Sequence, residues 1–167
     1  MSEISTPREL FVHELGDILY VEQQLATKAL PKLIAEVEDS EFRTALEEHL
    51  TQTKKHVSNV EKVFELLGED AEAEVCLAFE GLTKEHAEMV KETSSDLIDI
   101  VDLGAAARTE NYEIAAYETL RRMAKALGED DAVALLDENL KQEKAALQLV
   151  ESIGKRMAKD AKQMAHA

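Results

Sequence analysis

Apolar residues recur at intervals of three and four positions through nearly the whole chain, with few interruptions. This spacing places them on one face of an α-helix, so the pattern predicts an all-α protein. Thr6 and Pro7 mark the first helix start, because Thr suits the N-cap and Pro suits the first helical position. We expect this helix to run to about Val37, with a bend or irregularity near Pro31, which has no backbone N–H.

A second long helix follows directly. Ser40 can cap its start, and Gly68 is expected to end it after Leu67. The polar segment GEDAEAEV then forms a connector. It leads into a shorter helical segment, VCLAFEGLTKEHAEMVKET, which we expect to be interrupted around Gly81.

The two remaining helices are predicted over residues 95–127 and 130–162, with a frayed tail behind them. Short connections join the first helix to the second and the third to the fourth, so each pair is expected to form an antiparallel hairpin. Residues 68–95 separate the two pairs and are long enough to travel the length of a bundle. The pattern therefore predicts one domain over residues 1–167, with its core at about 7–162: a ferritin-like four-helix bundle with one long crossover that contains a short helix.

Composition supports this helical interpretation. Among 167 residues there are only six Gly and two Pro, and aromatic residues make up 4%. A chain of this length buries most of its apolar surface on folding without help from a disulfide, and Cys76 is the single cysteine. The N-terminal sequence has no secretory signal pattern and no apolar run is long enough to span a membrane, so we expect a cytoplasmic protein.

Acidic residues outnumber basic ones by 35 to 19, which gives a formal net charge of -16. Such a surface repels phosphate backbones, so we expect no nucleic-acid partner. The segment KRMAKDAK near the C-terminus is the one basic run, and runs of this kind are most often solvated helix faces.

Acidic residues interrupt the apolar stripe near the middle of three of the four helices. They are Glu22 in the first helix, Glu110 and Glu113 in the third, and Glu143 in the fourth. Antiparallel packing of helices of similar length brings their midpoints to one level, so these four carboxylates are expected to converge. An isolated buried charge costs several kcal/mol, so this arrangement predicts a site for two divalent cations. An oxygen-rich site with imidazoles favours iron, with manganese or zinc as alternatives.

The second helix allows two registers. One places His49, Thr53 and His56 on the buried face, where the imidazoles would be nitrogen ligands. The other buries Leu50 and Val57 and leaves both histidines on the flank as surface or interface residues. Taken singly, an acid such as Glu22 or Glu143 is more often solvated at a stripe edge, and Glu113 could instead form an ion pair.

Other polar and aromatic residues carry less information. The tyrosines, Tyr20, Tyr112 and Tyr117, are expected to be core or boundary aromatics. His13, His86 and His166 have no partner in the pattern. Cys76 is expected to pack as a small apolar residue.

Several segments together resemble the ferritin-like YciE/YciF family of stress-associated bacterial and archaeal proteins. They are ELGDILYVEQQL, EEHLTQTKKHVSNVEKVFELLGE, CLAFEGL, ENYEIAAYETL and LLDENLKQEKAAL. The resemblance implies a bundle with a crossover helix, a homodimer, and distant kinship with rubrerythrin and manganese catalase. It also implies ligand roles for Glu22, His56, Glu110, Glu113 and Glu143.

The chain departs from the usual di-iron pattern, in which a Glu-x-x-His motif occurs on two helices. Here the corresponding residues are Thr53 with His56, and Glu143 with Ala146. Asn111 also stands where relatives often have His. Thr53 cannot bridge two cations and Ala146 cannot be a ligand, so we expect one cation to bind more firmly than the second.

Three functional hypotheses follow. The first is a di-metal carboxylate protein that reacts with peroxide or oxygen during oxidative or osmotic stress. The second is a non-enzymatic dimeric scaffold with a degenerate or structural metal site, and the third, less favoured, is iron storage in a hollow shell. A homodimer is expected because Phe11, Val12, Ile18 and Leu25 broaden the apolar face of the first helix.

Overall fold

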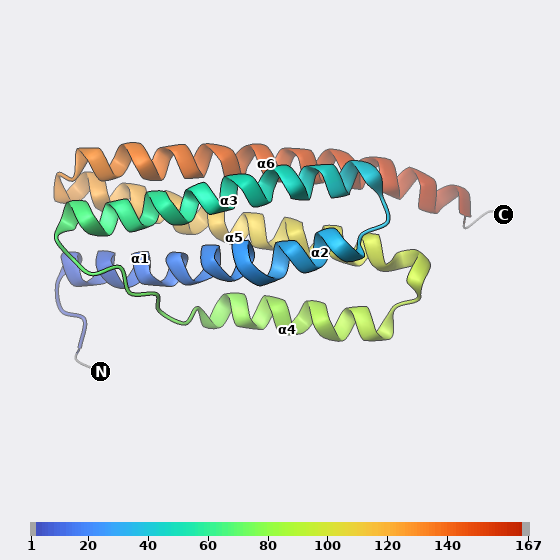
Figure 1. The fold of residues 1–167 in the computed structure, drawn as a ribbon, viewed down its shortest axis with the longest axis horizontal. Coiled ribbons are helices and arrows are strands. Elements are labelled where there is room, and N and C mark those ends of the chain that lie inside the picture. Colours follow the sequence, from blue (N-terminus) through green and yellow to red (C-terminus); the bar gives the residue numbers. More distant parts are fainter. Residues whose placement is uncertain (1–2, 165–167) are drawn as a thin grey trace.

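The computed structural model describes residues 3–164, and every regular element in this range is helical (Figure 1). The long elements are α1 (Pro7–Gln24), α2 (Leu30–Glu36), α3 (Ser40–Leu67), α4 (Leu77–Glu92), α5 (Ile98–Leu127) and α6 (Asp130–Met164). A π-helical turn, Leu25–Ala29, joins α1 to α2, and a 3₁₀ turn, Ser95–Leu97, precedes α5. The prediction of an all-α fold is confirmed.

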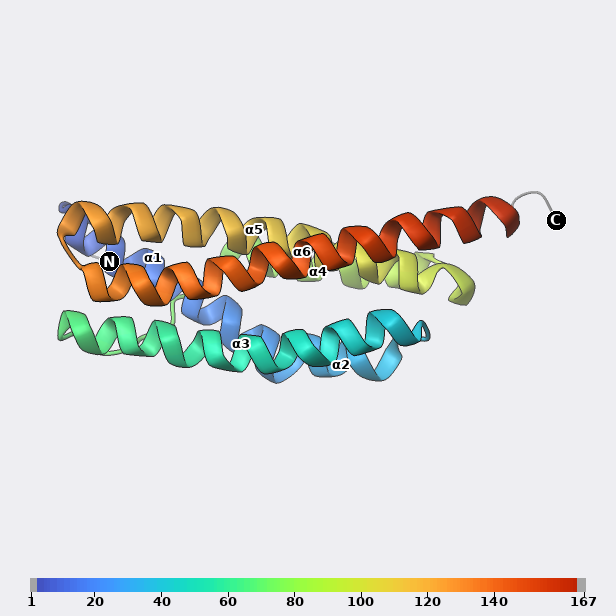
Figure 2. The ribbon, with the colours of Figure 1, turned by 90° about the horizontal axis from the view of Figure 1, so that it is seen from above.

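Four helices form the bundle, if α1 and α2 are taken as one bent helix. Figure 1 shows α1, α3, α5 and α6 running along a common axis, and Figure 2 shows α5 beside α6 and α3 beside α2. The crossover from α3 to α5 passes along the outside of α1 and includes α4, which packs mainly on α5. This is the predicted ferritin-like bundle with one long crossover that contains a short helix.

The irregular turn between α1 and α2 lies just before Pro31, as expected. The N–H of Leu30 bonds to the carbonyl of Leu25, the i to i−5 spacing of a π-helix. Because Pro31 has no N–H, the carbonyl one turn before it has no helical donor, and the wider turn accommodates this loss. The chain then continues as α2 to Glu36.

The start of α3 differs from the prediction. Asp39, and not Ser40, is the N-cap: its Oδ1 accepts a hydrogen bond from the Phe42 N–H at 2.9 Å. The Nη2 of Arg156 on α6 donates to both oxygens of Asp39, at 2.8 Å each. This distant arginine fixes the carboxylate at the helix start, which a local pattern does not reveal.

Two other boundary predictions are corrected. Gly81 does not interrupt α4, which is continuous over Leu77–Glu92. An isolated glycine destabilises a helix by about 1 kcal/mol and does not by itself end it. At the C-terminus, α6 continues to Met164, and the remainder of the predicted frayed tail lies outside the described residues.

Gly16 allows the connector after α3 to lie directly against α1. The N–H of Glu74 donates to the carbonyl of Gly16 at 2.9 Å. A Cβ at Gly16 would lie 2.9 Å from the carbonyl oxygen of Glu72, closer than atoms of these types approach. The glycine therefore sets the path of the crossover along α1.

The face of the first helix that we expected to be available for dimerisation is buried within the single chain. Phe11 and Ile18 are 0% exposed and Leu25 is 5% exposed. They belong to the core of the bundle, so these three side chains are not available to a second copy, and the homodimer itself stays a prediction. Among residues 3–164, no helix has the length and hydropathy that crossing a membrane requires.

Candidate metal centre

All six side chains singled out from the sequence lie together at the middle of the bundle. Each is between 0% and 6% exposed. They are Glu22 on α1, His49 and His56 on α3, Glu110 and Glu113 on α5, and Glu143 on α6. Four helices thus contribute polar groups to one buried cluster, which we call the carboxylate cluster.

The carboxylate cluster consists of two overlapping groups of candidate ligands. The first contains His49, Glu110, Glu113 and Glu143, and the second contains Glu22, His56 and Glu143. Within each group, one ligand atom from every residue lies within 4.8 Å of the others. Glu143 belongs to both groups, so its carboxylate lies between two candidate cation positions.

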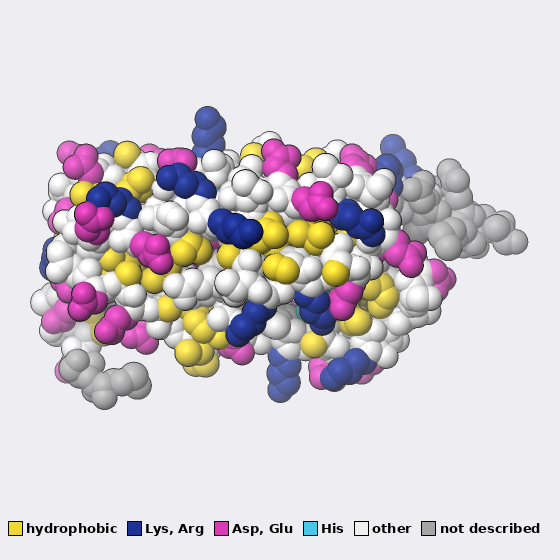
Figure 3. Space-filling model, viewed as in Figure 1, with side chains coloured by type: hydrophobic (Ala, Val, Ile, Leu, Met, Phe, Trp, Pro, Cys, Tyr) yellow, Lys and Arg dark blue, Asp and Glu magenta, His cyan; other side chains and the backbone are white. Residues whose placement is uncertain are grey.

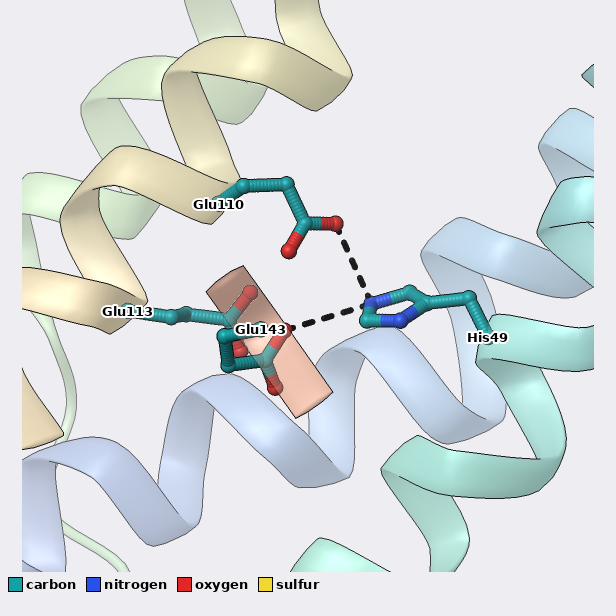
Figure 4. A group of neighbouring side chains, drawn as sticks. All are labelled: His49, Glu110, Glu113 and Glu143. Carbon is teal, nitrogen blue, oxygen red and sulfur yellow. Dashed lines mark ion pairs between the residues drawn. The ribbon is translucent and has the colours of Figure 1, made fainter. Parts of the chain in front are cut away.

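In the first group, the imidazole of His49 faces two carboxylates (Figure 4). Its Nε2 lies 3.2 Å from Oε1 of Glu110 and 3.8 Å from Oε2 of Glu143. Burial lowers the pKa of His49, and the charge of Glu110 only partly opposes this, so the imidazole is neutral near neutral pH. A neutral imidazole is the form that binds a metal ion.

Glu113 is the least satisfied member of the cluster. Its carboxylate is fully buried, and neither oxygen has a hydrogen-bond partner among the described residues. Burial is the main cause that raises the pKa of Glu113 well above its usual range, and the charges of Glu143, Glu22 and Glu110 add to it. In the absence of a cation, the protonated form of this side chain is therefore strongly favoured.

Glu110 and Glu143 show the same effect. Burial is again the main cause, and it raises the pKa of both carboxyl groups. Histidines offset this in part: His49 acts on Glu110, and His56 acts on Glu143. A bound cation would relieve both the burial of these charges and their mutual repulsion, so the cluster could hold a metal ion.

His56 links the second group to a neighbouring amide. Its Nδ1 lies 2.7 Å from Oε1 of Glu143 and 3.3 Å from Oε1 of Glu22. On the other side of the ring, Nε2 lies 2.8 Å from Oε1 of Gln142. An amide oxygen only accepts, so Nε2 carries a proton and donates, which leaves the Nδ1 lone pair directed at the two carboxylates.

Without a cation, Nδ1 of His56 also takes up a proton. Burial alone would lower the pKa of His56, but the hydrogen bonds and charges of Glu143 and Glu22 outweigh it and raise the pKa to about 10. The protonated ring neutralises one of the four carboxylates. Among residues 3–159 no Lys or Arg forms an ion pair with any of the four, so the other carboxylates can be neutralised only by protons or by a cation.

A second layer of polar groups supports the cluster. The hydroxyl of Tyr117 donates to Oε1 of Glu22 and accepts from Nδ2 of Asn139 at 3.0 Å. Asn59 in turn donates to Oδ1 of Asn139 at 2.7 Å. All of these side chains are buried. The expectation for Tyr117 as a core aromatic is confirmed, but its hydroxyl also orients a candidate ligand.

The structure chooses between the two registers of the second helix. His49 and His56 are 6% and 0% exposed, whereas Leu50 and Val57 are only half-buried. Thr53 is buried on the same stripe, and its Oγ1 donates to the carbonyl of His49 at 2.9 Å. Thr53 is thus satisfied within its own helix and contributes nothing to the carboxylate cluster.

Two of the isolated residues have polar partners that the sequence pattern did not indicate. His86 does have a partner, because its Nε2 lies 2.7 Å from Oδ1 of the buried Asp102. Cys76 packs in the apolar core, as expected, and its thiol also has polar partners. Its Sγ caps α4 by accepting from the Phe79 N–H at 3.3 Å and lies 3.0 Å from the hydroxyl of Tyr112. His166 lies outside the described residues.

Fold and cluster together define a class: a ferritin-like four-helix bundle with carboxylates and imidazoles buried at mid-height. Comparison with known proteins shows the family of the chain. The model of the family described as Domain of unknown function (DUF892) matches residues 6–163, so the chain belongs to this family. It is also 33% identical over 147 residues to Protein YciF of Escherichia coli strain K12, covering 85% of this chain and 86% of that protein.

Solved structures agree with this assignment. YcfI of Rhodopseudomonas palustris, for which a structural role has been suggested, aligns with a TM-score of 0.85 and 38% identity over 89% of this chain and 95% of that one. The Escherichia coli stress protein YciF aligns with a TM-score of 0.83 and 32% identity over 90% and 95% of the two chains. A protein from Xanthomonas campestris, at 18% identity and a TM-score of 0.77, shares the fold over 97% of this chain and 100% of its own. The resemblance predicted from the sequence motifs is confirmed.

Proposed function

We propose that this chain is a stress-associated protein that binds two divalent cations, iron or manganese, within the carboxylate cluster. One observation carries the proposal. Both oxygens of the fully buried Glu113 lack a donor, in a cluster of four carboxylates with no Lys or Arg partner in the described part of the chain. Bound cations would supply the missing positive charge and the missing partners.

The residues would divide between two positions. His49, Glu110 and Glu113 would hold one cation, Glu22 and His56 would hold the other, and Glu143 would bridge them. Each position then receives one nitrogen and several carboxylate oxygens, a donor set that suits iron or manganese, with zinc as an alternative. Glu113, which no hydrogen bond holds, would be the ligand most free to move.

Iron or manganese bound here would supply a redox couple for a small oxidant such as peroxide or oxygen. The chain's own groups would hold the ligands in place. Gln142 keeps Nδ1 of His56 directed at the carboxylates, and Tyr117 holds Glu22. The surrounding core excludes bulk water from these charges, which strengthens their interactions.

Metal analysis tests the proposal directly. The protein would be analysed as isolated, after iron loading and after manganese loading, and we expect about two cations per chain in a loaded sample. Fewer than about one cation per chain under all conditions would reject the two-metal site. Matched variants locate the cations: Glu22→Gln and Glu110→Gln should each lose one position, and Glu143→Gln should weaken both. Glu138→Gln, an exposed change on α6, is the control.

A second candidate function is a non-enzymatic scaffold whose metal site is structural. Thr53 and Ala146 at usual ligand positions favour it, as does the structural role suggested for the relative YcfI. Assays of peroxide consumption and of ferrous oxidation on metal-loaded protein separate the candidates. Turnover that disappears in Glu143→Gln supports redox chemistry, whereas full metal loading without turnover supports the scaffold.

We also propose that the protein is a cytoplasmic homodimer that binds neither nucleic acid nor a membrane surface. The net charge of -16 disfavours both kinds of anionic partner. For the dimer, the two most exposed large apolar side chains lie on the crossover, where Val75 is 61% and Leu77 is 82% exposed. Light scattering distinguishes a dimer from a monomer and from a large iron-storage shell.

A further inference from the structure

A cavity of about 160 Å³ extends from the carboxylate cluster toward the surface. Residues of α2, α3, α4, α5 and α6 line it, and its inner end is formed by His49 and Glu110. The walls are mainly apolar and include Leu33, Phe42, Leu46, Leu82, Ala106 and Val150. Figure 2 shows that α2 and α3 lie on one side of the bundle and α5 and α6 on the other, and residues of both sides line the cavity.

Small side chains create this space. Ala106 on α5 and Ala146 on α6 both line the cavity. Ala146 lies three residues after Glu143, where the Glu-x-x-His motif of di-metal bundles places an imidazole. Because the alanine side chain ends at Cβ, the volume that an imidazole would fill beside the cluster is left to the cavity.

We infer that this cavity is a binding chamber for a small, uncharged, apolar molecule next to the first group of the carboxylate cluster. Its volume is comparable to that of a cavity of about 150 Å³, lined by Leu, Ile and Phe, that binds benzene or xenon. A strongly polar molecule would leave its hydrogen bonds to water unreplaced along these walls. Size and lining therefore select molecules up to about the size of benzene.

The charges at the outer edge also favour an uncharged occupant. Lys32 and Arg108 line the cavity and are exposed, but each faces an acid: Glu36 at 4.0 Å and Glu85 at 3.4 Å. Figure 3 shows hydrophobic and basic side chains next to one another over α2 on the face seen in Figure 1. Because Lys32 and Arg108 are already paired with acids, they attract an anion only weakly, and the net charge of -16 repels it.

This inference extends the proposed function. A catalytic role for the bound molecule rests on the proposed metal site. The inference names the class of molecule that reaches the side of His49 and Glu110: dioxygen or a small hydrocarbon fits, whereas hydrogen peroxide would lose its hydrogen bonds on the way. Binding itself depends only on the shape and chemistry of the cavity.

The test uses the full-length protein freed of metal with EDTA, and xenon and benzene as probes. Crystals under xenon pressure should show anomalous density in the cavity, and benzene should raise the melting temperature in a saturable manner. Ala146→Leu fills the cavity and should weaken benzene binding at least about tenfold. Ala145→Leu makes the same change at an exposed neighbouring position and should change it less than about twofold.

Ala106→Leu fills the cavity from α5 and keeps the test decisive if Ala146→Leu fails to fold, which circular dichroism would reveal. An empty cavity under xenon, or benzene binding that is equal in wild type and in the folded filled variants, overturns the inference. Cation content is measured on separate portions of the same preparations, after loading with iron or manganese. Benzene binding together with no cation uptake on loading would refute the proposed function alone, and cation uptake together with no benzene binding would refute the chamber alone.

Discussion

Replacing Glu113 with Gln should stabilise the metal-free protein as the pH rises and should remove most of the stabilisation that a cation at the first position provides. The Glu113 carboxylate is fully buried and has no donor among the described residues. Burial, together with the charges of Glu143, Glu22 and Glu110, raises its pKa well above 4.5. The amide of Gln has a similar shape, carries no charge and can donate to the neighbouring carboxylates.

The size of the effect follows from proton linkage. Above pH 4.5 the unfolded chain loses the Glu113 proton, while the folded metal-free chain keeps it up to its raised pKa. Between these two values the free energy of unfolding of the wild type falls with rising pH by up to about 1.4 kcal/mol per pH unit. The variant lacks this contribution. Its advantage over the wild type should therefore vanish below pH 4.5 and grow through the window above it.

Urea unfolding in EDTA at several pH values between 4 and 8 measures this difference, with the exposed Glu138→Gln as the control. Saturation with manganese at about 1,000 times the dissociation constant of the first position should then add about 4 kcal/mol from that position to the wild type and much less from it to Glu113→Gln. Parallel pH profiles for wild type and Glu113→Gln would refute the reasoning. They would mean that this carboxylate is ionised and satisfied in the folded metal-free protein.

Three further changes probe the surroundings of the cluster. Gln142→Met removes the acceptor that orients His56 and should weaken metal affinity by about 10- to 100-fold in a chelator competition titration; unchanged affinity would contradict this role. Tyr117→Phe leaves Glu22 without its buried donor and should lower the free energy of unfolding by about 1–3 kcal/mol in urea, whereas a change below about 0.5 kcal/mol would show that the bond contributes little. Gly16→Ala would place a Cβ 2.9 Å from a backbone oxygen of the crossover, so limited proteolysis of the connector should be faster than in the wild type; equal rates would show that the contact relaxes freely.

The convergence of the candidate ligands could be predicted because it depends on two regular quantities, helical periodicity and helix length. Glu22, Glu110 and Glu143 lie on the apolar stripes of their helices, and antiparallel packing brings the midpoints of those helices together. No long-range information was needed for this step. The same reasoning placed the irregular turn before Pro31, since the missing N–H is a property of that residue alone.

Features that depend on a distant partner could not be predicted in this way. Asp39 becomes the cap of α3 because Arg156, from the other end of the chain, holds its carboxylate. His86 has a partner only because the crossover brings α4 against Asp102 on α5. Neither contact leaves a signal in the spacing of residues along one helix.

The sequence pattern did indicate the polar residues that support the cluster, although we did not predict their role. Asn59, Tyr117 and Asn139 each lie three or four residues from a candidate ligand on the same helix, so they share its inward face. A polar residue on that face, one turn from a buried carboxylate or imidazole, is a natural hydrogen-bond partner for the cluster. Gln142 differs, because it precedes Glu143 directly and reaches His56 on the neighbouring helix, a contact that only packing creates.

Under the proposed function, the two departures from the usual ligand pattern have a common explanation. Bundles with a Glu-x-x-His motif on two helices take one imidazole from each. Here both imidazoles come from α3: His56 serves the second group, and His49, two turns away on the same face, serves the first. Since His49 already supplies the nitrogen of the first group, position 146 is free to be alanine, and the space beside the cluster becomes the apolar cavity. The relocated imidazole and the cavity are thus two consequences of one rearrangement, in which the cluster keeps a nitrogen for each cation position and gains a path to the surface.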